Sequence, residues 1–88
     1  MKKIVTMTEV DGEGLEALLG KKVMLWCLNY IYAGTLAGVN ASFVKLEDAQ
    51  VVYETGPLTN AGYKDAQELP GDCWYVQTGA IESFGTGK

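Results

Sequence analysis

The feature that most limits the folds open to this chain is the absence of any charge between Lys22 and Lys45. An uncharged run of that length, containing a GxxxG spacing at Gly34 and Gly38, has features of a membrane-spanning helix. The longest purely apolar piece, however, is only Val23 to Leu28, and the rest of the run is rich in aromatic, glycine and polar residues. Such a run fits two or three β-strands better than one helix. We therefore expect no membrane span.

The first of these strands, Val23 to Leu28, carries apolar side chains on both faces. Successive residues of a strand point to opposite sides of the sheet, and here neither side is polar. A free-standing antiparallel sheet normally exposes one polar face, so a helix and a neighbouring subunit are expected to cover the excess. Gly34 and Gly38 share a face of the next strand, where they would let the strand bend sharply, as a small barrel requires.

Glycine, proline and asparagine residues divide the rest of the chain into further elements. An i, i+3, i+4 spacing of leucines predicts a short amphipathic α-helix over residues 13–19, with Asp11 as its cap and Gly20 as its stop. An extended segment over residues 3–10 is an open option. No internal repeat or linker is present, so residues 1–88 are expected to form a single domain. The expected strands are 23–28, 31–39, 43–54, 73–76 and 80–84, with one long insert at 55–72.

The composition argues against several classes of protein. A chain of 88 residues buries only about 60% of its unfolded surface, so partner subunits are an expected source of stability. The net charge is −4 and all seven basic residues are lysine, which argues against a nonspecific duplex-DNA binder. Two cysteines and no histidine leave no ordinary zinc site and no histidine-activated nucleophile. We therefore expect no enzymatic activity, no metal and no cofactor.

The N-terminus begins like a signal peptide, with Lys2 and Lys3 before a short apolar segment. Acidic residues follow at the place where small cleavage-site residues would be needed. We therefore expect a cytoplasmic protein with reduced thiols, in which Cys27 is a small core residue rather than a nucleophile.

Two blocks of sequence together resemble the Sm-like family, which includes the LSm and Hfq proteins. The first block comprises GKKVMLWCL (20–28), YAGTLAGVN (32–40) and LEDA (46–49), and the second is WYVQTGAIESFG (74–85). The resemblance covers residues 13–54 closely and 73–85 more loosely, and it matches residues 55–72 to the family's variable loop. It implies a mainly β fold, a strongly bent five-stranded antiparallel barrel with a short N-terminal α-helix. It also implies a homo-oligomeric ring of five to seven subunits.

The resemblance places RNA contacts on two loops. The family's loop after the second strand carries an aspartate, then an aromatic residue or methionine, then an asparagine, and here Asn40 stands at the aspartate position. Many members have an arginine–glycine pair in the second motif, and here Thr78 replaces the arginine. Stacking and hydrogen bonding at such loops bind single-stranded RNA. The candidate RNA-binding residues are Asn40, Ser42, Phe43, Gln77, Thr78 and Gly79.

The resemblance also places the subunit interface on the last two strands, because the family pairs the fourth strand of one subunit with the fifth strand of the next. Such pairing removes exposed sheet edges and gives apolar side chains somewhere to be buried. The candidate interface residues are Trp74, Tyr75, Val76, Ile81 and Phe84.

Several of these features have a structural alternative. Asn40 can equally stabilise its own turn through its side chain. The pair Lys21–Lys22 is either a phosphate contact or a solvated helix end, and Glu47–Asp48 is better explained by the bend of the LEDA motif than by carboxylate chemistry. Two functions remain in view: a ring that binds single-stranded RNA around its pore, and a ring of the same fold whose partners are other proteins.

Overall fold

The computed structural model of the protein describes residues 13–88. The segment 3–10 and Asp11, for which the sequence suggested an extended strand and a helix cap, lie outside the described residues. Within residues 13–88, no helix has the length and apolar content that crossing a membrane requires. The elements, in chain order, are η1 (Leu15–Leu18), β1 (Lys22–Cys27), β2 (Ile31–Val39), β3 (Phe43–Glu54), β4 (Asp65–Glu68), β5 (Cys73–Gln77), η2 (Thr78–Ala80) and β6 (Ile81–Thr86).

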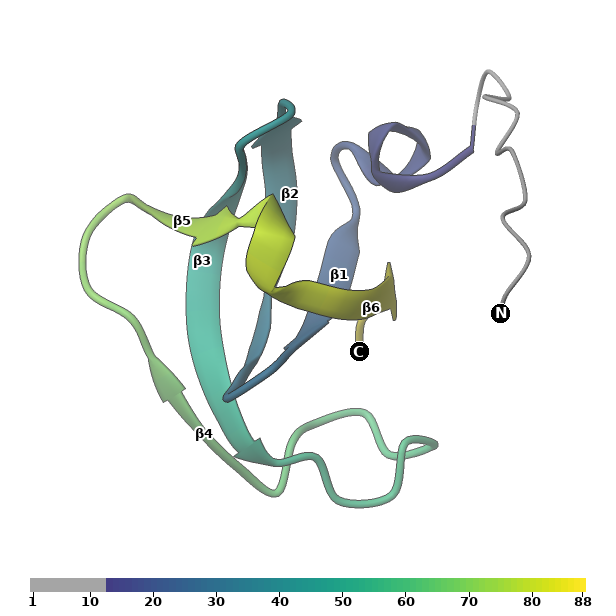
Figure 1. Ribbon diagram of the computed structural model, residues 1–88. Helices are drawn as coiled ribbons and strands as arrows, with labels where there is room; N and C mark the ends of the chain where they lie inside the picture. Colours follow the sequence, from purple (N-terminus) through teal and green to yellow (C-terminus); the bar gives the residue numbers. More distant parts are fainter. Residues whose placement is uncertain (1–12) are drawn as a thin grey trace, which may run out of the picture.

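The fold is mainly β, as predicted, and all of its strand pairs are antiparallel. The strand order is β4-β3-β2-β1-β6, and β5 also pairs with β3. Figure 1 shows β3 as a long curved strand, with β5 beside one half and β4 beside the other. Among the described residues β6 pairs with β1 only, so the six strands form one sheet that does not close into a barrel.

The sheet bends where β2 and β3 change register. Between Ala33 and Thr35 the pairing partner moves from Gln50 to Glu47, which leaves an extra residue in β3. The bulge contains Asp48, whose φ of 50° lies in the left-handed region that aspartate tolerates better than most residues. A second shift, between Leu36 and Gly38, lies in β2. The bend expected from the LEDA motif and the strand glycines is therefore present as two β-bulges.

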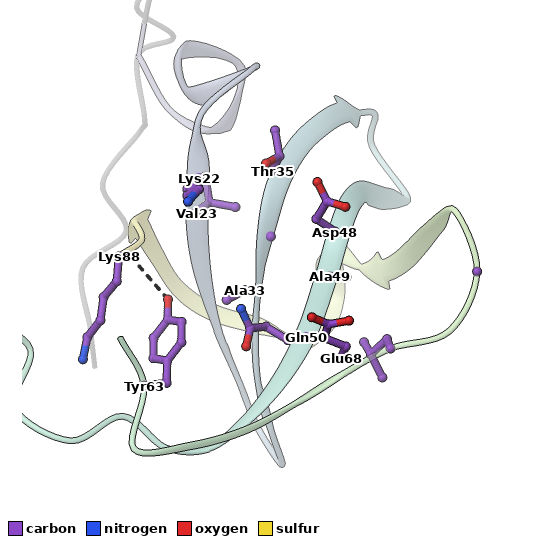
Figure 2. Close-up of a pocket in the computed structure, with 13 residues that line it drawn as sticks. Lys22, Val23, Ala33, Thr35, Asp48, Ala49, Gln50, Tyr63, Glu68 and Lys88 are labelled. Atoms are coloured by element: carbon purple, nitrogen blue, oxygen red, sulfur yellow. Dashed lines mark hydrogen bonds between the residues drawn. The ribbon is translucent and has the colours of Figure 1, made fainter. Parts of the chain in front are cut away.

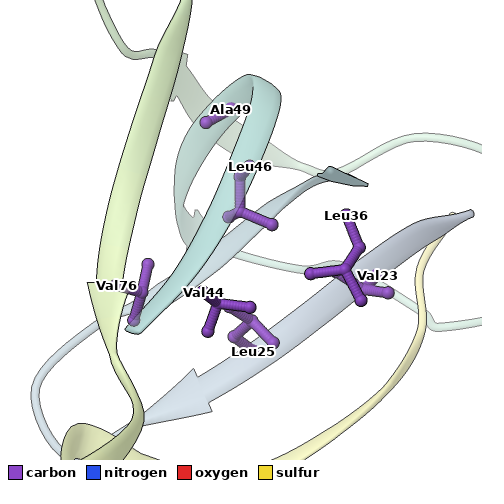
Figure 3. Packing of buried hydrophobic residues seen from close by; sticks show 7 residues of the cluster. All are labelled: Val23, Leu25, Leu36, Val44, Leu46, Ala49 and Val76. Carbon is purple, nitrogen blue, oxygen red and sulfur yellow. The ribbon is translucent and has the colours of Figure 1, made fainter. Parts of the chain in front are cut away.

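The core lies inside this bend. Its side chains come from β1, β2, β3 and β5, as Figure 3 shows. The other face of β1 is covered only in part, because Met24 is 6% exposed while Trp26 is 37% exposed. Burial on both faces, expected from the sequence, is therefore present at Met24 and absent at Trp26. The core cluster consists of Val23, Leu25, Leu36, Val44, Leu46, Ala49 and Val76.

The prediction of an N-terminal α-helix over residues 13–19 was wrong. The segment forms only the 3-10 helix η1, which starts after Gly14 without a side-chain cap and ends at Leu19 in an extended conformation. A helix of one turn gains too few hydrogen bonds to offset the cost of nucleation. Leu15 and Leu18 still pack against the core, and Gly20, at a φ of 85°, ends the segment as expected.

The insert at 55–72 also differs from the loop that the sequence predicted. Its residues Asp65–Glu68 form β4, whose partners in β3 lie between Gln50 and Glu54. The period-two pattern of a strand is hard to recognise in the polar sequence DAQE, because its four side chains are exposed or only half-buried. Pairing with the long β3 strand is what makes this segment a strand, and the sheet therefore has six strands instead of five.

Candidate nucleic-acid interface

Two loops that are far apart in the sequence meet at one end of β3. Phe43 pairs with Gln77 in the β3–β5 register. The backbone N–H of Thr78 donates to the carbonyl of Ser42 at 3.0 Å, and the Thr78 hydroxyl donates to the carbonyl of Ala41 at 2.7 Å. The structure therefore joins the two groups of residues that the sequence suggested for RNA binding, residues 40–43 and 77–79.

Asn40 uses its side chain to hold this turn. Its Oδ1 accepts hydrogen bonds from the backbone N–H groups of Ser42, at 2.7 Å, and Phe43, at 2.9 Å. The backbone N–H of Asn40 also donates to the carbonyl of Phe43 at 3.0 Å. Side-chain bonds of this kind favour asparagine in turns. The turn-stabilising role left open by the sequence is thus present, while the whole residue remains exposed.

Phe43 and Tyr75 form an exposed aromatic pair beside the turn. Their ring centroids are 5.1 Å apart with an edge-to-face angle of 82°, and the two residues are 39% and 54% exposed. Lys45 pairs with Tyr75 in the register, and paired residues lie on the same face of an antiparallel sheet. The outer face of β3 and β5 therefore combines two aromatic rings with one cation.

The surroundings of Tyr75 act on its hydroxyl. The neighbouring Cys73 side chain raises the pKa of Tyr75, while the cation of Lys45 opposes the shift. Sequence reasoning placed Tyr75 only at the subunit interface and did not select Lys45. Alternation around the buried pair Val44 and Val76 could have identified both, because their neighbours must point outward.

The candidate interface residues fall into three groups by burial. Tyr75 and Phe84 are 54% and 42% exposed. Trp74 and Ile81 are half-buried and pack against the core of their own subunit. Val76 is only 5% exposed and belongs to that core. Tyr75 and Phe84 are therefore the most exposed of the five candidates.

Phe84 has the geometry of an uncovered core residue. It pairs with Leu25, which is fully buried on the inner face of the sheet. Paired residues share a face, so the ring of Phe84 lies on the core side and is nevertheless exposed. It lies on the edge strand β6, beside a core cluster that is itself buried.

Within residues 13–88, no group of three or more His, Cys, Asp or Glu side chains is placed to hold a metal ion. Cys27 and Cys73 are free thiols, and burial raises the pKa of Cys27, which disfavours the thiolate that a nucleophile needs. The side chains of Glu47 and Asp48 are exposed where the strand bulges.

Comparison of the chain with protein-family models, curated proteins and solved structures found no match. The Sm-like resemblance therefore depends on the two sequence motifs alone.

Proposed function

We propose that this chain is an Sm-like subunit that assembles into a homo-oligomeric ring and binds single-stranded RNA around the pore. The observation that carries the proposal is the convergence of residues 40–43 with residues 77–79, through the Thr78 hydrogen bonds to Ser42 and Ala41. These residues were selected from two separate motifs, and they form one continuous surface. A site that reads bases needs such a combination of polar groups and an exposed aromatic ring.

The chemistry available at this surface is stacking rather than charge attraction. Phe43 can stack with a base, and base–aromatic stacking does not depend on sequence. Tyr75 packs edge-to-face against Phe43 and supports that ring, while the proposed ring of subunits would cover the rest of its side chain. Lys45 supplies a single cation. A net charge of −4 on each subunit opposes the approach of phosphate over about 10 Å at 0.1 M salt. We therefore expect weak binding with a shallow salt dependence, since few phosphates are neutralised.

The test is fluorescence anisotropy with labelled oligo-U, oligo-A and random RNA at two salt concentrations. Phe43→Ala is expected to weaken binding about tenfold, because it removes one stacking surface. Tyr53→Ala is the matched control, since Tyr53 is 51% exposed on the distal half of β3. A Tyr53→Ala effect as large as that of Phe43→Ala would contradict this placement of the site.

A gain-of-function pair of variants completes the test. Thr78→Arg introduces the stacking cation that many family members carry, but it removes the hydroxyl bond to Ala41. Gln77→Arg adds the same cation at an exposed position and leaves that bond intact. We expect tighter RNA binding from Gln77→Arg, and from Thr78→Arg if the turn survives the loss of its hydrogen bond.

The second candidate function is a protein-interaction scaffold of the same fold. It is favoured by the use of the Asn40 Oδ1 and Thr78 hydroxyl groups inside the turn, which leaves fewer polar groups to read a base. Absence of saturable RNA binding at low salt, in the wild-type protein and in Gln77→Arg alike, would reject the RNA function and favour the scaffold.

A further inference from the structure

The side chain of Lys88 ends in a cradle of backbone carbonyl groups from the insert. Its Nζ donates to the carbonyl oxygens of Thr55, at 2.8 Å, Pro57, at 2.9 Å, and Gly62, at 2.9 Å. A lysine ammonium has three donors, and all three are satisfied here. The Nζ also lies 5.0 Å from the centroid of the Tyr63 ring, within the range of a cation–π contact. Figure 2 shows Lys88 alongside Tyr63.

The insert organises this cradle through its own hydrogen bonds. The Thr55 carbonyl also accepts from the backbone N–H of Lys64 at 3.3 Å, and the Pro57 carbonyl accepts from that of Asn60 at 3.0 Å. Each carbonyl has two lone pairs, so these bonds orient the oxygens and leave one lone pair for the ammonium. Gly56 has a φ of 67°, a conformation that glycine adopts without strain.

We propose that residues 55–63 form a binding site for a primary ammonium group, and that Lys88 is its tethered ligand. Three converging acceptors match the three N–H bonds of an alkylammonium. The carbon chain, here the lysine stem, takes the fourth tetrahedral direction around the nitrogen. A quaternary ammonium has no hydrogen to donate, and a bare metal cation lacks the stem. The site therefore selects a primary amine by hydrogen-bond geometry. This inference is independent of the proposed function.

The position of Lys88 indicates what the site does for the fold. Lys88 lines a polar cleft of about 360 Å³ with Lys22, Gln50 and Glu68. It also lines a neighbouring apolar groove of about 470 Å³ with Trp26 and Leu58. The bound ammonium ties the insert to the residues that follow β6, and Lys88 contributes to the walls of both hollows.

The experiment measures backbone amide chemical shifts of Gly56 and Gly62 by NMR in the full chain. Lys88→Met keeps most of the stem and removes the three donors, so both signals are expected to move. Lys88→Ala removes the stem as well and leaves room for a free amine. Adding ethylammonium to Lys88→Ala should return both signals toward their wild-type positions in a saturable manner, whereas tetramethylammonium and K⁺ should not. Lys64→Met is the matched control, because Lys64 has only a 3.9 Å contact between its Nζ and exposed Glu54.

Three outcomes would overturn the proposal. The first is that Lys88→Met leaves the two glycine signals in place. The second is that ethylammonium fails to reverse their displacement. The third is that tetramethylammonium or K⁺ reverses it equally well, because the site would then recognise charge alone. Thermal unfolding of Lys88→Met and Lys88→Ala, followed by circular dichroism, verifies that both variants are folded.

Discussion

At the residue scale, the Cys27 thiol links the stability of this sheet to pH. Burial raises the pKa of Cys27 above its ordinary value of 9.0. Because the folded pKa is the higher one, the thiol's contribution is fully present below the unfolded pKa and is lost as the pH rises through the folded pKa. We expect the melting temperature of the wild-type protein to fall more steeply above about pH 9 than that of Cys27→Ala.

Thermal denaturation at a series of pH values checks this prediction. Cys27→Ala also removes some packing, so its curve starts from a different level and only the two slopes are compared. Parallel curves through the alkaline range would mean that the thiol ionises equally in the folded and unfolded states.

At the element scale, the bend between β2 and β3 requires that Gly34 lack a Cβ atom. A Cβ at that position would lie 2.9 Å from the Glu47 carbonyl oxygen and 3.2 Å from the Ala49 Cα. Those atoms belong to the bulged backbone of β3, which cannot move aside without breaking the register. Gly34→Ala is expected to destabilise the protein by about 1–3 kcal/mol, as measured by urea denaturation.

Gly38→Ala provides the control in the same strand. A Cβ there would lie 3.8 Å from the Lys45 Cβ, an ordinary van der Waals contact. Its free energy of unfolding is expected to stay close to that of the wild-type protein. Equal losses in the two variants would attribute the effect to general strand propensity rather than to the bulge.

At the scale of the whole molecule, the proposed ring would pair the sheet edges formed by β5 and β6. Native mass spectrometry is expected to show a closed ring of five to seven subunits, as the proposed function requires. Phe84→Lys should disrupt that ring, because an unpaired charge buried at an interface costs several kcal/mol. Tyr75→Lys tests the opposing edge. A monomeric wild-type protein at micromolar concentration would refute the ring.

The choice of these two residues follows from their exposure. Trp74 and Ile81, the other aromatic and aliphatic candidates, pack against the core, so a charge there would destabilise the subunit as well as the interface. Leu28→Lys is the control, since Leu28 is 76% exposed after the end of β1. A ring that tolerates Phe84→Lys and Tyr75→Lys as well as it tolerates Leu28→Lys would show that other surfaces hold it together.

The sequence by itself determined the local features of the fold. The bounds of β2 and β3 are those predicted, and β1 differs by one residue at each end, because side-chain alternation and turn residues act over short distances. The same local reasoning failed for η1 and β4. Leucine spacing cannot indicate that a helix ends after one turn, and a polar segment becomes a strand only when a partner strand is available.

Only the tertiary structure decided which backbone groups meet. The Thr78 hydroxyl reaches Ala41, and the Lys88 ammonium reaches the carbonyls of residues 55–62. Every residue has a backbone carbonyl, so the residue types do not reveal which carbonyls will accept these hydrogen bonds. Side-chain chemistry was therefore readable from the sequence, while the assembly of both candidate sites depended on the path of the backbone.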